Sequence, residues 1–235
     1  MNVAYNRDCL AAMREMPDKA VDLAVVDVPY GIGEGGQKSA SRGKQVDFGK
    51  SKSNAKAYNK VYHTFDDSKA PDKEYFEQLM RVSKNQIIFG ANHFISKIPY
   101  DSHCWIVWDK ENDVNDFADC ELAWTSFKSA VRIFRFKWNG MLQGNMKDKE
   151  IRIHPTQKPV ALYRWIFQRY ANPGDKILDT HLGSGSSRIA AYDAGLDFVG
   201  YEIDKEYFDK QEERFDRHTA QMNLFIDTEV IPMQN

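Results

Sequence analysis

The chain has few cysteines and lacks long apolar segments. Its three cysteines, Cys9, Cys104 and Cys120, include no Cys-x-x-Cys pair, which argues against a zinc site or a disulfide framework and predicts buried free thiols. No run of about 18 apolar residues is present, and no charged-then-apolar leader opens the chain. These absences predict a soluble cytoplasmic protein that binds no metal and spans no membrane.

With 235 residues, of which 42% are hydrophobic, the chain is long enough to bury one core, and a single domain over residues 1–235 is expected. The formal net charge of −2 gives no indication of nucleic-acid binding, but the distribution of charge does. Residues 31–62 carry seven basic and two acidic side chains, a net +5 that leaves −7 for the rest of the chain. This segment has no helical or alternating period, so we interpret it as a mobile basic loop.

Aromatic side chains at Phe48, Tyr58 and Tyr62 are spaced among these charges, as in a loop that follows a phosphate backbone and stacks on bases. The alternative is a solvated loop that has no ligand. The nucleic-acid hypothesis assigns the contacts with the partner to Lys38, Arg42, Lys44, Lys50 and Lys52.

Apolar runs alternate with amphipathic segments along most of the chain, which predicts an α/β fold with a mostly parallel sheet covered on both faces. Three β-like stretches follow one another without a helix between them and predict an antiparallel edge. Residues 140–152 are polar and predict a loop. The expected strands are 21–26, 86–89, 104–108, 121–127, 131–138, 176–179 and 197–201; the expected helices surround Leu10 and Met13, follow Asp72, cover 159–171 and 187–194, and follow Asp204.

A glycine turn at residues 179–186, Asp-Thr-His-Leu-Gly-Ser-Gly-Ser, lies between an expected strand and an expected helix. Glu202 ends the next strand, which completes the pattern of a nucleoside-binding half-fold in which a carboxylate accepts hydrogen bonds from ribose. The third glycine of a dinucleotide turn is replaced by Arg188, and the lysine of a phosphate-binding loop is missing. The turn therefore favours a nucleoside without a diphosphate, such as S-adenosylmethionine, whose ammonium Asp179 could receive. A purely structural turn is the alternative.

A second motif, Asp27-Val28-Pro29-Tyr30, directly follows the expected strand 21–26. Pro29 forces Val28 into an extended conformation, so that the Val28 carbonyl and the Asp27 carboxylate can face the same space. These two acceptors suit an exocyclic amino group, and Tyr30 can stack on the base that carries it. An ordinary strand-to-loop turn is the alternative.

A third motif, His154-Pro155-Thr156-Gln157-Lys158-Pro159, precedes the expected helix 159–171. The backbone amides at the helix start and the Lys158 ammonium predict a carboxylate site, to which Thr156 could add a hydrogen bond. His154 is more typical of a cap or a packing residue than of a residue in direct chemistry.

Together the three motifs resemble the signature blocks of amino-group DNA methyltransferases, and their order resembles the circularly permuted β group of that family. The resemblance runs from about Asn6 to Phe215. It implies a seven-stranded, Rossmann-like methyltransferase fold, S-adenosyl-L-methionine as cofactor, and a DNA base flipped out of the duplex. It assigns the target base to Asp27, Val28, Pro29 and Tyr30, and the cofactor to Asp8, Cys9, His154, Thr156, Lys158, Asp179, Gly183, Ser184, Gly185 and Glu202.

Two positions depart from the family pattern. Val28 replaces the first proline of the usual Asp-Pro-Pro-Tyr, although valine keeps the backbone carbonyl that the interaction needs, and His181 stands where the family usually has an apolar or aromatic residue. Asp27, rather than serine, favours adenine N6 over cytosine N4. The sequence therefore predicts a DNA adenine-N6 methyltransferase of the restriction-modification type.

Several alternatives stay open. They are a cytosine-N4 or RNA-adenine methyltransferase, a glutamine methyltransferase, a catalytically dead nucleic-acid-binding homologue and, more distantly, an NAD-linked oxidoreductase. Residues 31–62 and 110–153 are the candidate target-recognition segments, and a second copy of the chain is a candidate partner.

Overall fold

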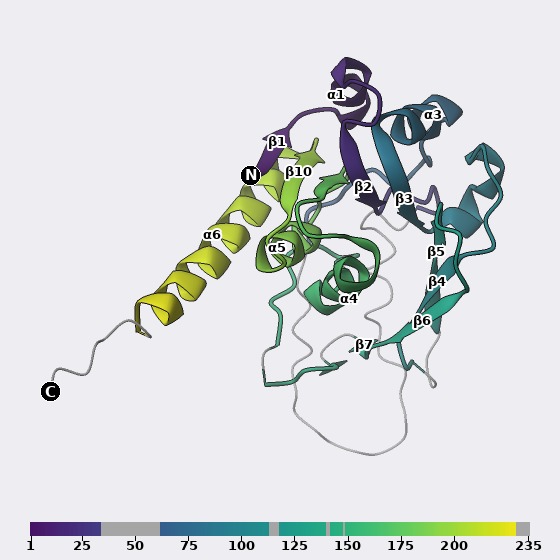
Figure 1. Cartoon of the computed structure of the whole chain (residues 1–235). Coiled ribbons are helices and arrows are strands. Elements are labelled where there is room, and N and C mark those ends of the chain that lie inside the picture. The colour runs from purple at the N-terminus through teal and green to yellow at the C-terminus, as the bar shows by residue number, and fades with distance from the viewer. Residues whose placement is uncertain (34–61, 113–117, 140–141, 148, 229–235) are drawn as a thin grey trace, which may run out of the picture.

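The computed structural model describes residues 1–33, 62–112, 118–139, 142–147 and 149–228. An eight-stranded sheet runs through the described part of the chain in the order β1-β10-β9-β2-β3-β5-β4-β6, and β7 pairs with β8 in a small ribbon (Figure 1). The strands are β1 Asn2–Asn6, β2 Val21–Val26, β3 Ser83–Phe89, β4 Trp105–Asp109, β5 Cys120–Thr125, β6 Arg132–Arg135, β7 Trp138–Asn139, β8 Leu142–Gln143, β9 Lys176–Asp179 and β10 Asp197–Glu202.

Helices cover both faces of the sheet (Figure 1). On one face, α1 (Cys9–Glu15) and α3 (Lys73–Val82) bury Met13, Phe76 and Leu79 against β2 and β3. The other face carries α4 (Val160–Tyr170), α5 (Ser186–Asp193) and the long α6 (Lys205–Thr228). Two short 3-10 turns, Ala91–His93 and Ile95–Lys97, follow β3. Because strands β2, β9 and β10 are buried on both faces, they read in the sequence as nearly continuous apolar runs.

Parallel pairing fixes the direction of five neighbouring strands, β1, β10, β9, β2 and β3. Their carboxyl ends therefore meet at one edge of the sheet. β5 runs antiparallel to both β3 and β4, so its amino end, at Cys120 and Glu121, reaches that same edge. Six strands therefore contribute residues to one rim of the fold, where α/β proteins commonly bind ligands.

The structure confirms the predicted α/β class, with its mostly parallel sheet and antiparallel portion, and corrects several details. The sheet has eight described strands where seven were expected, because β1 pairs with β10 at its edge. The sequence did not predict β1, whose residues are partly or fully exposed. The predicted strand 131–138 is divided into β6 and β7, since the chain turns away from the sheet after Arg135. The predicted loop 140–152 contains the short strand β8.

Arg188, whose bulk excluded a dinucleotide turn, lies buried between α5, α6 and β1. Its guanidinium donates to Glu212 at 2.6 Å, to Gln211 at 3.0 Å and to Asn2 at 2.9 Å, and it stacks over the Phe215 ring at 3.9 Å. A single arginine therefore takes the place of the close helix–strand contact that a third glycine would allow. It joins the two helices behind the glycine turn to the edge strand.

Arg188→Met is expected to lower the free energy of unfolding by about 2–3 kcal/mol, because it removes a buried charge together with its hydrogen bonds. Urea unfolding measures this loss. Arg164→Met is the matched control, since Arg164 is half exposed and pairs with Asp193 on the neighbouring helix. The control is expected to cost less than about 1 kcal/mol. Equal losses in the two variants would contradict the role assigned to Arg188.

Candidate active site

A cleft of about 1070 Å³ opens at the rim where the strand ends meet. One of its walls comes from the Asp27 motif, and another comes from the turn after β9. Of the residues assigned to the site from the sequence, the lining includes Asp27, Val28, Pro29, Tyr30, His154, Thr156, Lys158, Gly183, Ser184 and Glu202. All three sequence motifs therefore meet in one cleft.

Tyr30 is held in place by its hydroxyl and by its ring. The hydroxyl donates to Asp27 Oδ1 at 2.9 Å, and the ring stacks on His93 with centroids 5.1 Å apart and an interplanar angle of 17°. Gly90, at the end of β3, lies against the same ring: a Cβ built on it would be 2.1 Å from Tyr30 Cε1. One face of a ring predicted to stack on a target base is thus occupied by His93, a residue that the sequence reasoning did not single out.

Lys158 lies beside Asp27, which differs from its predicted role at a carboxylate of the cofactor. Its ammonium is 2.5 Å from Asp27 Oδ2 and 3.0 Å from Glu121 Oε2, and it donates to the Tyr30 hydroxyl at 3.2 Å. The side chain is only 4% exposed. Burial lowers the pKa of Lys158, but the two carboxylates outweigh burial and raise it overall, so the amine stays charged. The Lys158 charge is therefore neutralised by two carboxylates of the protein, Asp27 and Glu121.

Glu121 is a site residue that the sequence reasoning missed. One of its oxygens meets Lys158, and the other meets the Lys110 ammonium at 2.5 Å. Burial raises its pKa, but the two lysines outweigh burial and lower it to about 2. Glu121 is the second residue of β5, whose antiparallel direction brings its first residues to the ligand rim. A charged residue at the start of an otherwise apolar antiparallel strand was the available signal.

The turn after β9 brings backbone amides and a carboxylate to the other part of the cleft. Gly183 has φ +49 and donates its amide to Glu202 Oε2 at 2.8 Å, while Glu202 Oε1 accepts from the Asp204 amide at 2.9 Å. A Cβ on Gly183 would come no nearer than 3.8 Å to the His154 ring, so glycine here serves the left-handed backbone rather than close packing. The turn keeps an open approach for a ligand.

Asp179 lies beneath this turn and is 2% exposed. Its carboxylate accepts from Ser187 Oγ at 2.5 Å and from the His181 amide at 3.1 Å. Burial raises its pKa to about 7, and the Asp27 and Glu202 carboxylates add to the shift. Asp179 and Gly185 do not line the cleft themselves. They support the residues that do.

Two histidines at the site are neutral packing residues. Burial lowers the pKa of His154 to about 3, and its ring packs on Tyr207 with centroids 4.2 Å apart. The Thr156 amide and hydroxyl both bond His154 Nδ1, so Thr156 is fixed to its own turn. Burial lowers the pKa of His181 to about 4, and its ring meets the Tyr75 ring edge-on. This packing gives a physical reason for a histidine at position 181.

Asp8 and Cys9, predicted to contact the cofactor, are not among the lining residues. Asp8 caps α1 by accepting from the Ala11 amide at 2.6 Å. Cys9 is the first residue of that helix, and burial raises the pKa of its thiol to about 12. Their helix follows β1, which pairs with β10 up to Glu202, so both lie at the ligand rim but outside the cleft.

The predicted basic contacts Lys38, Arg42, Lys44, Lys50 and Lys52 lie outside the described residues. The structure describes how the flanking residues are held. The Asp67 carboxylate accepts from the Gly31 amide at 2.9 Å, and the Asp67 carbonyl accepts from the Gly33 amide at 3.0 Å. On the far side of the segment, His63 lies 3.0 Å from both Asp204 and Glu206 of the α6 region.

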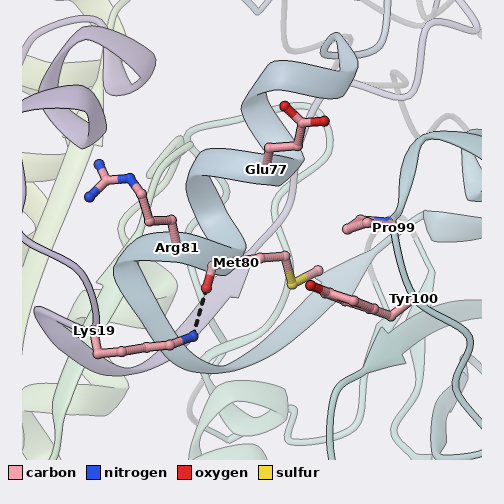
Figure 2. Close-up of a pocket in the computed structure, with 6 residues that line it drawn as sticks. All are labelled: Lys19, Glu77, Met80, Arg81, Pro99 and Tyr100. Atoms are coloured by element: carbon pink, nitrogen blue, oxygen red, sulfur yellow. Dashed lines mark hydrogen bonds between the residues drawn. The ribbon is translucent and has the colours of Figure 1, made fainter.

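A second hollow, of about 460 Å³, lies beside α3 and contains none of the predicted site residues (Figure 2). Its lysine, Lys19, donates to the carbonyls of Met80 and Ser83 at 2.8 and 2.9 Å. Arg81, another lining residue, donates to the Met16 carbonyl at 2.7 Å and pairs with Asp18 at 2.8 Å, so both cations of the hollow are already bonded within the protein. Over the described ranges, no three metal-binding side chains cluster, and no helix is long and apolar enough to cross a membrane.

The chain matches a known protein family over most of its length. A family model described as DNA methylase, of the N6/N4 methyltransferase group, matches residues 45–213, which is most of the chain. The chain therefore belongs to this family of DNA methyltransferases, whose cofactor is S-adenosyl-L-methionine, as the sequence motifs predicted.

Particular relatives agree with this assignment. The chain is 24% identical over 247 residues to the type II methyltransferase M.HpaI of Haemophilus parainfluenzae, covering 89% of this chain and 72% of that protein. The crystal structure of the M1.HpyAVI–SAM complex matches with a TM-score of 0.52 and 20% identity, over 91% of this chain and 98% of that one. The cytosine-N4-specific PvuII DNA methyltransferase matches with a TM-score of 0.56 and 14% identity, over 95% and 92%.

Gly90→Ala is expected to lower the free energy of unfolding by about 2–4 kcal/mol, because the new Cβ collides with the Tyr30 ring at a residue whose φ is +68. Gly195→Ala is the matched control: its φ is +66, and nothing lies within 4 Å of the added Cβ. The control is expected to cost about 1 kcal/mol for the backbone alone. Urea unfolding of both variants isolates the collision, and a difference near zero would show that Tyr30 moves aside freely.

Proposed function

We propose that the protein transfers a methyl group from S-adenosylmethionine to the N6 amino group of adenine in DNA, with the target base flipped into the cleft. The observation that carries this proposal is the meeting of the Asp27–Tyr30 motif with the Gly183 turn and Glu202 in one cleft. A base and a methyl donor bound to these two parts would share one water-restricted space.

The cleft fits the cofactor in shape and in charge. Gly183 leaves room above the turn, Glu202 presents a carboxylate to the cleft, and Asp179 lies buried below. Asp179 would receive the methionine ammonium, Glu202 the ribose hydroxyls, and the turn at Gly183, Ser184 and Gly185 the methionine end. When bound, S-adenosylmethionine supplies an electrophilic methyl group on a sulfonium. Thr156 remains a candidate for the carboxylate, whereas Lys158 is assigned to Asp27.

The protein's own contribution to the chemistry is orientation. The Asp27 carboxylate and the Val28 carbonyl would accept from the adenine amine, direct its nitrogen toward the methyl carbon and raise the electron density on it. Asp27 or water would then take the proton that the methylated nitrogen loses. Asp27, in place of the serine typical of cytosine enzymes, supports adenine as the target. The cytosine-N4-specific PvuII enzyme has the same fold, so cytosine N4 is the second candidate.

The DNA contacts belong to the same proposal. The basic residues Lys38, Arg42, Lys44, Lys50 and Lys52 would neutralise phosphates, and residues 110–153 would contribute to target recognition as part of the single domain. Exposed basic side chains in the second segment, at Lys128, Arg132 and Lys147, are consistent with that role.

Nucleoside analysis tests the reaction directly. DNA incubated with the protein and methyl-tritiated cofactor, then digested to nucleosides, is expected to carry the label on N6-methyladenine. Asp27→Ala is expected to lose transfer by at least about a hundredfold, because the amine loses its charged acceptor, and to keep cofactor binding. Label on N4-methylcytosine would move the assignment to the second candidate, and full activity of Asp27→Ala would contradict the amine-binding role.

Cofactor affinity is expected to depend on pH through Asp179. Because its pKa is about 7 in the folded protein against 3.8 for an ordinary aspartate, the free protein loses stability as the pH rises from about 4 to 7. A ligand ammonium needs the carboxylate, so its affinity rises over the upper part of this window.

Calorimetry with S-adenosylhomocysteine is expected to show affinity about tenfold higher at pH 8 than at pH 6. Asp179→Asn is expected to bind weakly at both values, without this slope. His154 and His181, whose pKa values burial lowers to about 3 and about 4, stay neutral throughout this range and cannot produce the slope. A wild-type affinity that does not change with pH would contradict the pairing of Asp179 with the ammonium.

A further inference from the structure

Four charged side chains form one network at the amine-binding end of the cleft, in which Lys158 is buried and the other three are partly exposed. Asp27 contacts Lys158, Lys158 contacts Glu121, and Glu121 contacts Lys110, at 2.5, 3.0 and 2.5 Å. Two of the four are carboxylates and two are ammonium groups, so the charges balance. Phe89 lies 4.8 Å below the Lys158 ammonium and restricts water on that side.

Lys158 presents a difficulty for the proposed reaction. Its ammonium occupies Asp27 Oδ2, and the Tyr30 hydroxyl occupies Oδ1, so the acceptor intended for the target amine is already bonded by the protein. A carboxylate has further lone pairs and can accept an additional N–H. However, a fixed cation beside it opposes the positive charge that grows on the target nitrogen during transfer.

Glu121 is placed to offset this cation. It contacts the Lys158 ammonium directly and is held in turn by Lys110, whose side chain is 16% exposed. It is the other carboxylate in contact with Lys158 among the described residues. Tyr30 lies between the two carboxylates, since its hydroxyl donates to Asp27 and is 3.4 Å from Glu121 Oε2.

We infer that Glu121 is a positioning residue for methyl transfer: it balances the charge of Lys158, so that the network beside the target amine carries no net positive charge. Lys158, in turn, fixes the Asp27 carboxylate and holds its place before the amine arrives. This inference rests on the proposed function and adds a residue to it. It also gives Lys158 a role at the base-binding end rather than at the cofactor.

Charge removal in pairs tests the inference. Glu121→Gln leaves the network, Asp27 included, with one net positive charge, and single-turnover transfer is expected to fall on the order of tenfold to a hundredfold. Adding Lys158→Met to Glu121→Gln restores the balance and is expected to recover about tenfold of that loss. If Glu121 had only a structural role, the second substitution, Lys158→Met, would not restore activity.

Lys110→Met in the Glu121→Gln background is the matched control. It removes the same charge, but from a lysine that contacts Glu121 and not Asp27. It is expected to restore less activity than Lys158→Met does. Calorimetry with S-adenosylhomocysteine is expected to give the wild-type affinity for every one of these variants, because the ion pairs and hydrogen bonds of Lys110, Glu121 and Lys158 involve Asp27 and Tyr30 rather than the cofactor turn.

The outcomes separate the inference from the function on which it rests. Wild-type transfer with an equally active Glu121→Gln variant overturns the inference and leaves the proposed function standing. A double variant, Glu121→Gln with Lys158→Met, that is no faster than Glu121→Gln also overturns it. If the wild-type protein labels no DNA base, the proposed function fails, and the inference fails with it. Reduced cofactor affinity in Lys158→Met would return Lys158 to the cofactor carboxylate.

Discussion

Parallel pairing of β1, β10, β9, β2 and β3 is the constraint on which the rest of the structure depends. It brings the ends of β2, β9 and β10 to one rim, although their sequences lie up to about 175 residues apart. Asp27, Asp179 and Glu202 are each attached to one of those ends. Two carboxylates that no short loop could assemble, Asp27 and Glu202, thereby line one cleft, and a third, Asp179, is buried at the same rim. The helices on both faces keep water from the sheet that positions them.

Carboxylates that lie near one another repel, and each of these three acids is stabilised against that repulsion in a different way. Burial raises the pKa of Asp179, and hydrogen bonds from Ser187 and the His181 amide partly offset that effect. Glu202 accepts two backbone amides. Asp27 is paired with Lys158, which comes from the segment just before α4. Each of the three acids is therefore stabilised by a different set of protein groups.

The sequence predicted the fold class, most strands and helices, and the three motifs that line the cleft, because these depend on local periodicity and turn chemistry. It could not predict what depends on strand direction. Glu121 reaches the rim because β5 runs antiparallel, and the partner of Lys158 is Asp27, 131 positions away in the chain. A lysine beside a helix start predicted a site for the cofactor's carboxylate, whereas the tertiary structure pairs the Lys158 ammonium with Asp27 and Glu121.

Asp67 accepts hydrogen bonds from the Gly31 and Gly33 amides. The chain that leaves Tyr30 is therefore tied at once to the chain that returns at Asp67. A change of length between these points alters only a loop-closure entropy that grows slowly with the number of residues. The position of the Asp27 motif therefore depends on the Asp67 contacts rather than on the length of chain between Gly33 and Asp67. Replacement of the residues between Gly33 and Asp67 is therefore expected to leave the Asp27 motif in place, because Asp67 fixes the chain directly after Tyr30.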